Sequence, residues 1–180
     1  MTRPWYQKLF GSTPPPLEET TESKAAGGDA DAQFSLGFRC ANRVGPAQDF
    51  PQAATWYLKA ANQNHAMAQF NLGIMHASGQ GMPKDDAQAV GWFRKAAALG
   101  DSGAQYRLGV QEHRASFKGL PATMIEARIE AYKWFQLAAA SGYKGSAEAH
   151  ELLTQKMTHN DVTDGAQRVA AFTILLPSKP

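Results

Sequence analysis

Apolar and polar positions repeat along the chain with a period of 36 residues. The block Asp-Ala-Gln-Phe-Ser-Leu-Gly at 31–37 returns as Met-Ala-Gln-Phe-Asn-Leu-Gly at 67–73 and as Gly-Ala-Gln-Tyr-Arg-Leu-Gly at 103–109. A second block, Trp-Tyr-x-x-Ala-Ala from residue 56, returns as Trp-Phe-x-x-Ala-Ala after 36 and then after 42 residues. Two blocks that recur in one phase indicate three copies of the same structural unit.

Within each copy, the spacing of apolar residues predicts two antiparallel helices. Ala32, Leu36 and Cys40 recur every four residues, which places them on one face of a helix over about residues 30–42. The Leu-Gly pair in each first helix is expected to leave room for the second helix to pack closely. The Trp residues of the second block are expected to be packing anchors rather than ligand contacts: Trp56, Trp92 and Trp134.

Capping signals mark where each second helix begins and ends. The expected N-caps are Asp49, Asp85 and Thr123, each followed three residues later by Gln or Glu. Before Thr123, Pro121 is expected to stop the preceding helix. The second helices are expected to end at residues suited to a left-handed cap: Asn64, Gly100 and Gly142.

The third copy is six residues longer than the other two, with 42 residues in place of 36. The distance from the expected cap to the Trp grows from seven residues to eleven, so four of the six residues are expected to add about one turn to the last second helix. The other two extend the loop 114–122. This insertion is the most individual feature of the array.

These patterns divide the chain into a tail, three repeats and a cap. The tail is expected to be a flexible linker because it contains three consecutive prolines, two glycines and few apolar groups after Phe10. Two helical segments are expected in the last region, which would cap the stack. The predicted boundaries are 1–28 for the tail, 29–64, 65–100 and 101–142 for the repeats, and 143–180 for the C-terminal helical cap.

The composition supports helices and argues against a sheet. The chain of 180 residues contains 31 alanines but only 5 valines and 4 isoleucines. Strands favour β-branched residues, whereas alanine favours helices and lets their backbones approach closely. We therefore expect an all-α fold.

Charge and cysteine content narrow the classes of partner and compartment. The 18 basic and 16 acidic residues leave a net charge of +2 with no long run of either sign, so a dedicated nucleic-acid or membrane-surface binder is not expected. A local charged patch remains compatible with this balance. Cys40 is the only cysteine, which excludes an internal disulfide and fits a reducing, cytoplasmic compartment. No segment has the pattern of a secretory signal or of a membrane span.

The repeated motifs resemble the Sel-one-like repeat family, whose units are slightly longer relatives of tetratricopeptide repeats. The likeness rests on Ala-x-x-x-Leu-Gly in the first helix, on Gly-x-Gly at 79–81 followed by Asp85, and on Ala-x-x-Trp-Phe-x-x-Ala-Ala-x-x-Gly at 89–100. It covers roughly residues 29–142. The resemblance implies a right-handed α/α superhelix of three repeats plus C-terminal capping helices. It also implies a protein-binding scaffold or adaptor of a bacterial cell, without a catalytic centre, cofactor or metal.

By analogy with tetratricopeptide arrays, a partner protein or peptide would bind the concave face formed by the first helices. The candidate residues flank the Leu-Gly pairs, and the sharper ones are Phe38, Asn42, Asn71, Ile74, Arg107 and Val110. Amide and guanidinium groups among them suit a peptide backbone or a carboxylate. The aromatic residues one turn earlier are expected to belong mainly to the core: Phe34, Phe70 and Tyr106.

Two alternatives follow from other residues. Cys40, His76 and Glu112 occupy equivalent positions of the three repeats, which suggests a metal site or a hydrolase. Equivalent positions on stacked repeats are separated by roughly 8–10 Å or more, too far for shared metal ligands or a nucleophile–base pair, so packing is expected instead. The other alternative is self-association, in which the aromatic tail of one chain docks on another through Trp5, Tyr6, Leu9 and Phe10.

Overall fold

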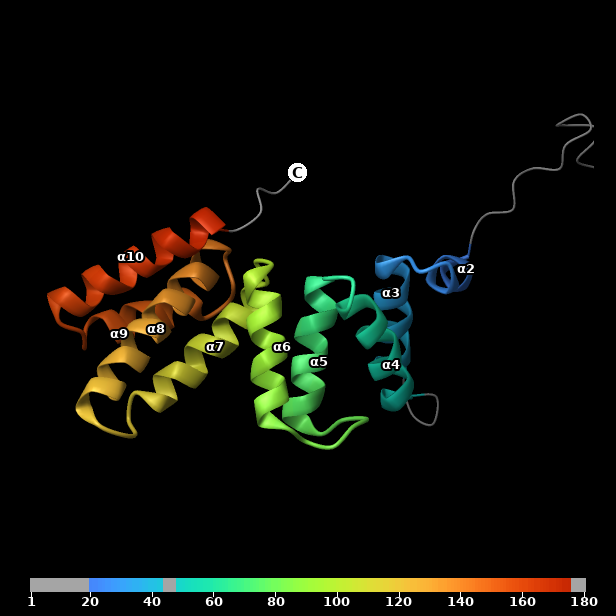
Figure 1. The fold of residues 1–180 in the computed structure, drawn as a ribbon, viewed down its shortest axis with the longest axis horizontal. Coiled ribbons are helices and arrows are strands. Elements are labelled where there is room, and N and C mark those ends of the chain that lie inside the picture. Colours follow the sequence, from blue (N-terminus) through green and yellow to red (C-terminus); the bar gives the residue numbers. More distant parts are fainter. Residues whose placement is uncertain (1–19, 44–47, 176–180) are drawn as a thin grey trace, which may run out of the picture.

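The computed structural model describes residues 20–43 and 48–175, and every regular element within those ranges is an α-helix. The helices follow one another along an elongated array, with α2 at one end and α9 and α10 at the other (Figure 1). The predicted all-α architecture is confirmed. The helices are α2 (Thr21–Ala26), α3 (Ala30–Ala41), α4 (Phe50–Ala61), α5 (Ala66–Ser78), α6 (Asp86–Ala98), α7 (Ser102–Ala115), α8 (Pro121–Ala140), α9 (Ser146–Thr154) and α10 (His159–Leu175).

Six of the helices form three hairpins, in which α3 packs on α4, α5 on α6, and α7 on α8. A glycine in each first helix lets the aromatic ring of the second helix come close. A Cβ atom added to Gly73 would lie 2.4 Å from Cε1 of Phe93, which is closer than carbon atoms can approach. Equivalent contacts join Gly37 to Tyr57 and Gly109 to Phe135. The close packing predicted at the Leu-Gly pairs is therefore present in all three hairpins.

The ends of the second helices follow the predicted capping residues in the first two repeats. Oδ1 of Asp49 accepts a hydrogen bond from the backbone N–H of Gln52 at 2.8 Å, and Oδ1 of Asp85 accepts one from Gln88 at 2.9 Å. These bonds satisfy donors that a helix N-terminus otherwise leaves free. Left-handed backbone follows the second helix of all three repeats at the expected residues: Asn64, Gly100 and Gly142.

The second helix of the third repeat, α8, begins earlier than predicted. The prediction that Thr123 is its N-cap is wrong, because the cap is Leu120 and Pro121 lies in the first turn. Proline suits this position because its φ angle is already helical and it has no N–H to leave unpaired. Thr123 lies inside the helix, where its hydroxyl donates to the Leu120 carbonyl at 2.8 Å. Residues expected in the loop are thus helical, and α8 reaches 20 residues.

A buried glutamine joins each repeat to the helix that precedes it. Gln69 is 1% exposed, and its Nε2 donates to the carbonyl oxygen of Ala61 at 3.0 Å. Gln105 makes the equivalent bond to Ala97 at 3.3 Å. Because a buried amide needs a hydrogen-bond partner, this contact fixes how one repeat is seated on the previous one.

Helix α2 corrects the prediction of a flexible tail for residues 21–26, while residues 1–19 lie outside the described part of the chain. Nε2 of Gln33 donates to the carbonyl of Ala25 at 3.2 Å, the same bond that links the later repeats. Ala25 is 2% exposed and packs against Leu36, while Gly28 has the left-handed φ of +98° found after the other second helices. Helix α2 thus makes the same contact with α3 that the end of α4 makes with α5 and the end of α6 makes with α7. The short Lys-Ala-Ala-Gly-Gly run resembles a linker, because alanine and glycine occur both in flexible linkers and at the packed ends of helices.

Helices α9 and α10 both pack on α8 at the other end of the array (Figure 1). A Cβ atom added to Gly165 of α10 would lie 2.4 Å from Cδ1 of Tyr132 in α8. Arg168 of α10 donates to the carboxylates of Glu126 and Glu130 in α8. Two helices are thus present in the region predicted to cap the stack, and both contact α8.

Candidate functional site

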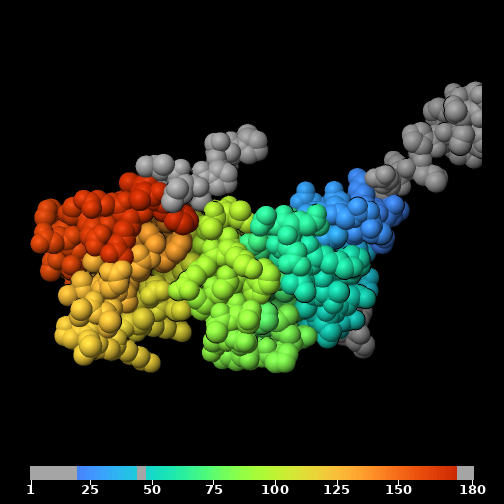
Figure 2. All heavy atoms as spheres, in the orientation of Figure 1, coloured from blue at the N-terminus to red at the C-terminus, as the bar shows by residue number. Residues whose placement is uncertain are grey.

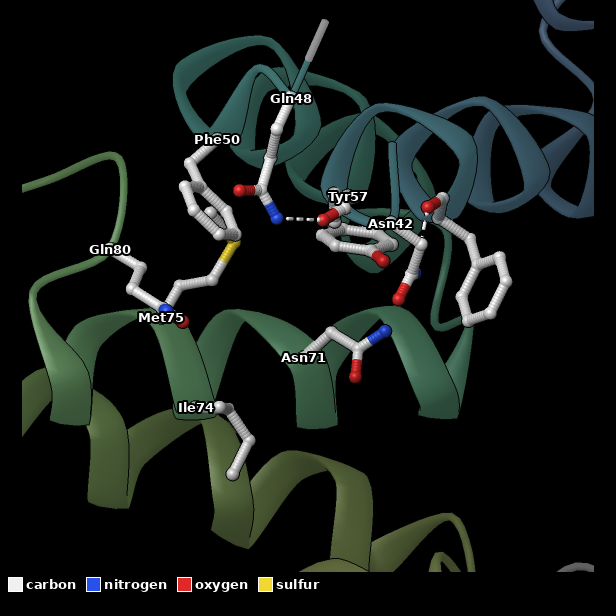
Figure 3. Close-up of a pocket in the computed structure, with 10 residues that line it drawn as sticks. Asn42, Gln48, Phe50, Tyr57, Asn71, Ile74, Met75 and Gln80 are labelled. Carbon is white, nitrogen blue, oxygen red and sulfur yellow. Dashed lines mark hydrogen bonds between the residues drawn. The ribbon is translucent and has the colours of Figure 1, made fainter. Parts of the chain in front are cut away.

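Three surface hollows lie in a row along the first helices, one at each junction between successive units. The first, which we term the amide hollow, has a volume of about 320 Å³ and lies between α3, α4 and α5 (Figure 3). None of its side chains carries a formal charge, and four of them are amides. The lining residues are Phe38, Ala41, Asn42, Gln48, Phe50, Tyr57, Asn71, Ile74, Met75 and Gln80.

The amides at the rim of this hollow are tied to the end of α3. Nδ2 of Asn42 donates to the carbonyl of Phe38, and Nε2 of Gln48 donates to the carbonyl of Ala41, both at 2.8 Å (Figure 3). These bonds orient the amide groups. The Phe38 ring beside them is 53% exposed, so the hollow offers one large apolar surface next to fixed polar groups.

Tyr57 supplies the floor of the amide hollow. Its ring is 3% exposed, and burial raises the pKa of its hydroxyl, while a hydrogen bond with the Asn71 side chain acts in the opposite direction. The phenol is therefore protonated at neutral pH. Asn71 of α5 points from below toward Asn42 and Tyr57, so amide groups from two repeats face one space (Figure 3).

The second hollow, which we term the basic hollow, lies between α5, α6 and α7 and has a volume of about 690 Å³. Figure 2 shows the surface hollowed between the yellow end of α7 and the green turn before α6. The lining residues are Ala77, Lys84, Asp86, Ala87, Ala89, Val90, Phe93, Arg107, Val110, Gln111 and Arg114.

The basic hollow repeats the frame of the amide hollow. Seven of its residues stand 36 positions after residues that line the first hollow: Ala77, Lys84, Asp86, Phe93, Arg107, Val110 and Gln111. The helices that hold them are also equivalent. The two hollows therefore differ mainly at the rim, where Lys84 replaces Gln48 and Arg107 replaces Asn71.

Positive charge dominates the rim of the basic hollow. Lys84, Arg107 and Arg114 are exposed cations that line it, and Asp86 is its one acidic lining residue. Nζ of Lys84 lies 3.5 Å from Oδ1 of Asp86, in an exposed pair that is screened by water. The hollow thus carries an excess of positive charge over apolar walls, in a chain whose net charge is only +2.

The third hollow, which we term the terminal hollow, lies between α7, α8 and α9 and has a volume of about 300 Å³. Val110 lines both this hollow and the basic hollow, so the row continues. Burial lowers the pKa of His113, and the nearby charges of Lys156 and Arg128 lower it further. Its imidazole is therefore neutral at pH 7. The lining residues are Tyr106, Val110, His113, Phe135, Ala149, Leu152, Leu153 and Lys156.

The structure distributes the six predicted binding residues over this row. Four of them line the amide hollow and the other two line the basic hollow: Phe38, Asn42, Asn71 and Ile74, then Arg107 and Val110. Ile74 and Val110 are only half-exposed, because they also pack against buried clusters of the next hairpin and of the cap. Asn71 is also half-exposed, whereas Phe38, Asn42 and Arg107 are exposed.

The aromatic residues expected in the core behave as predicted. Phe70 packs against Phe93 with ring centroids 5.8 Å apart, and Tyr106 packs against Phe135 at 5.6 Å. Phe34 stacks on the imidazole of His65 at the next repeat junction, at 4.6 Å. The three tryptophans contact the buried clusters, with Trp134 buried and the other two half-buried.

The structure does not bring Cys40, His76 and Glu112 together. Sγ of Cys40 donates to Oε1 of Gln52 at 3.0 Å, and His76 lines a separate apolar hollow beside Trp92. Burial raises the pKa of Glu112, and the neighbouring negative charge of Glu130 raises it further. Within residues 20–43 and 48–175, no three His, Cys, Asp or Glu side chains gather in a way that suits a metal ion.

Sequence reasoning missed the rim residues that come from the second helices and from the loops before them. Gln48 and Phe50, with their counterparts Lys84 and Asp86, lie around the starts of α4 and α6. The 36-residue period of the sequence does show that Gln48 is equivalent to Lys84, and Phe50 to Asp86. Only the fold shows that these positions face the first helices.

Stacked helical hairpins with a repeated surface frame define a protein of the α/α-repeat class. The sequence model of the Sel1 repeat matches residues 30–65, 66–101 and 102–143, and the chain belongs to this family. Sel1 repeat proteins generally act as scaffolds for protein–protein interaction, and the family is generally non-catalytic. No match is found among curated proteins.

Two solved structures show the same fold. A Sel1 repeat protein from Oxalobacter formigenes is 33% identical, with a TM-score of 0.61, and the match covers 73% of this chain and 94% of that one. The second is c5321, a protective antigen present in uropathogenic Escherichia coli strains and described as displaying an SLR fold. It is 23% identical, with a TM-score of 0.53, and the match covers 94% of this chain but only 43% of that one.

Two further sequence expectations concern the N-terminal aromatic residues and membrane-spanning segments. Trp5, Tyr6, Leu9 and Phe10, predicted to mediate self-association, lie outside the residues that the structure describes. Among the helices of the described part, none is both long enough and apolar enough to cross a lipid bilayer.

Proposed function

We propose that this chain is a non-catalytic scaffold that binds a protein or peptide segment along the row formed by the amide, basic and terminal hollows. The observation that carries the proposal is that the amide and basic hollows share a frame at the repeat period while their rims differ. A stacked array presents such a frame several times along one surface, and an extended ligand is then held at several points. The rim side chains decide which ligand fits.

Each predicted binding residue has a distinct part in this proposal. Phe38 is the exposed apolar anchor of the amide hollow. Asn42 and Asn71 offer both donors and acceptors to the backbone of a bound segment. Arg107 offers a charged, forked donor. Ile74 adds an apolar wall to the amide hollow, and Val110 lies between the basic and terminal hollows.

The proposal is tested by selecting ligands from a phage-displayed library of random peptides of about twelve residues, a length that spans roughly 40 Å when extended. The immobilised full-length chain is expected to enrich a family of related peptides. The double variant Phe38→Ala, Asn71→Ala is expected to bind them about tenfold more weakly, because it removes an apolar anchor and a polar contact. Fluorescence anisotropy with labelled peptides measures the dissociation constants.

The matched control is Met67→Ala. Met67 is 53% exposed, like Phe38, but it lines none of the three hollows. It is expected to leave peptide affinity unchanged. If no peptide family is enriched, or if both variants weaken peptide binding equally, the row of hollows is not the binding surface.

Self-association through the N-terminal aromatic residues is a separate proposal. Multi-angle light scattering of the full-length chain is expected to show a mass above that of the monomer, and removal of residues 1–19 is expected to restore the monomer. A monomeric mass for both proteins contradicts it.

A further inference from the structure

The charge of the row changes from one hollow to the next on an otherwise equivalent frame. The amide hollow is lined by no charged residue, and the terminal hollow is mainly apolar with a single lysine at its edge. Three cations line the hollow between them: Lys84, Arg107 and Arg114. A ligand that crosses all three hollows therefore meets a concentration of positive charge only at the middle one.

Two of these cations are available to a ligand. Arg107 and Arg114 lie seven residues apart on α7, so their side chains stand on one helical face two turns apart. Both side chains are exposed, and neither forms an ion pair with any residue that the structure describes. The third cation, Lys84, lies 3.5 Å from Asp86 in an exposed pair.

We infer that the scaffold recognises an extended peptide segment in which an Asp or Glu side chain occupies the basic hollow and uncharged residues occupy the hollows on either side. This inference rests on the proposed function and specifies its partner. The planar guanidinium groups donate paired, charge-assisted hydrogen bonds to a carboxylate. The apolar walls below them, formed by Val90, Phe93 and Val110, exclude water from one side of the pair.

The row also indicates that the acidic group is a side chain within the segment rather than its C-terminus. Val110 lines both the basic and the terminal hollow, so the surface continues beyond Arg107 and accepts further residues of the ligand. Neighbouring packed helices lie roughly 8–10 Å apart, and an extended chain advances about 3.3 Å per residue. We expect the acidic residue to stand about two to three residues from each uncharged anchor.

The peptide library tests this inference directly. Peptides enriched on the full-length chain are expected to carry one Asp or Glu at a fixed distance from apolar or aromatic residues. The variant Arg107→Glu is expected to bind those peptides at least about tenfold more weakly and to select peptides with Lys or Arg at the same position. Binding of the acidic peptides to the unmodified chain is also expected to weaken as salt is raised.

The control is Lys95→Glu, which makes the same change of charge away from the row. Lys95 is exposed on α6, and its Nζ lies 4.2 Å from the centroid of the Trp92 ring, beside the separate apolar hollow that Trp92 lines. It is expected to leave both affinity and peptide selection unchanged. Circular dichroism verifies that both variants keep the helical content of the parent.

The outcomes separate this inference from the proposal on which it depends. A peptide family that binds the row but lacks an acidic residue overturns the inference and leaves the scaffold function standing. Equal effects of the two charge reversals also overturn it, because overall charge would then explain the preference. The absence of any enriched peptide overturns both.

Discussion

At the residue scale, glycine decides how closely the two helices of a hairpin approach. The ring of Phe93 occupies the space that a Cβ atom of Gly73 would need, at a distance of 2.4 Å. The ring and the α5 backbone are both part of the packed interior, so neither moves without disturbing its neighbours. This contact explains why Leu-Gly recurs in phase with the aromatic residue of the second helix.

Gly73→Ala is expected to lower the free energy of unfolding by about 1–3 kcal/mol, because the added methyl group overpacks the interface. Gly91→Ala is the control, since a Cβ atom there meets nothing within 4 Å and the residue lies inside helix α6. It is expected to raise stability by about 0.4–1 kcal/mol through the lower entropy of the unfolded chain. Urea unfolding followed by circular dichroism measures both. Equal effects would contradict the steric explanation.

Gln69 acts at the same scale, but between repeats. Gln69→Ala is expected to lower the free energy of unfolding by about 2–3 kcal/mol, because it removes a buried hydrogen bond to Ala61 and leaves a cavity. Gln88→Ala is the matched change at an exposed position on α6 and is expected to cost less than about 0.5 kcal/mol. Chemical unfolding of the two variants side by side decides the point. Similar losses would show that the buried glutamine does not hold the repeats together.

At the scale of the helix, the sequence predicted the hairpins well because their signals are local. Period, capping aspartates and left-handed residues are each set by a few neighbouring side chains, as Asp49 and Asp85 show. The start of α8 was predicted incorrectly because Pro121 reads equally well as a stop or as a first-turn residue. Helix α2 was missed for another reason. Six residues do not make a stable helix alone, and α2 is stabilised by the next repeat, where Ala25 packs against Leu36 and Glu22 pairs with Arg39.

The candidate site was predicted only in part, again for physical reasons. Positions on the first helices follow from helical periodicity, so Phe38, Asn71 and Arg107 were found. Gln48 and Lys84 precede the second helices, and no local pattern shows that such residues turn back toward the first helices. The difference in charge between the two hollows depends on these rim positions, and it therefore follows from the fold rather than from a local sequence pattern.

Attachment of α10 to α8 depends on charge and therefore on pH. A hydrogen bond from Arg168 holds the pKa of Glu126 below its usual value. When the pKa of a carboxyl group is lower in the folded than in the unfolded chain, the ionised group stabilises the fold. This stabilisation is complete above the unfolded-chain pKa of about 4.3 and is lost as the pH falls through the folded-chain pKa. We expect Arg168→Gln to reduce the free energy of unfolding by about 1 kcal/mol at pH 7. At pH 3 the difference from the parent is expected to shrink.

Urea unfolding at the two pH values measures this difference. Lys144→Gln, at an exposed position after α8, is expected to show the same small effect at both pH values. A loss for Arg168→Gln that stays constant between pH 7 and pH 3 would mean that the side chain acts by packing rather than by charge.

At the scale of the whole molecule, the helices contact mainly their neighbours along the chain. The exception is α10, which returns to α8. In a stack of this kind, stability is approximately a sum of terms for each unit and each interface. The row of hollows follows the same direction as the stack, so its frame depends on the repeats that form each junction and little on distant ones.

Leu36→Ala tests this picture at the α2 end of the array. Leu36 is 5% exposed in a cluster with Ala25, and its truncation is expected to cost about 2–4 kcal/mol. Hydrogen exchange measured by mass spectrometry is expected to speed up in α2, α3 and α4, while α8, α9 and α10 keep their protection. Leu153→Ala, at a residue 3% exposed near the other end, is expected to give the reverse pattern. Faster exchange throughout the chain in either variant would instead show one cooperative unit, and the basic hollow would then depend on both ends of the array.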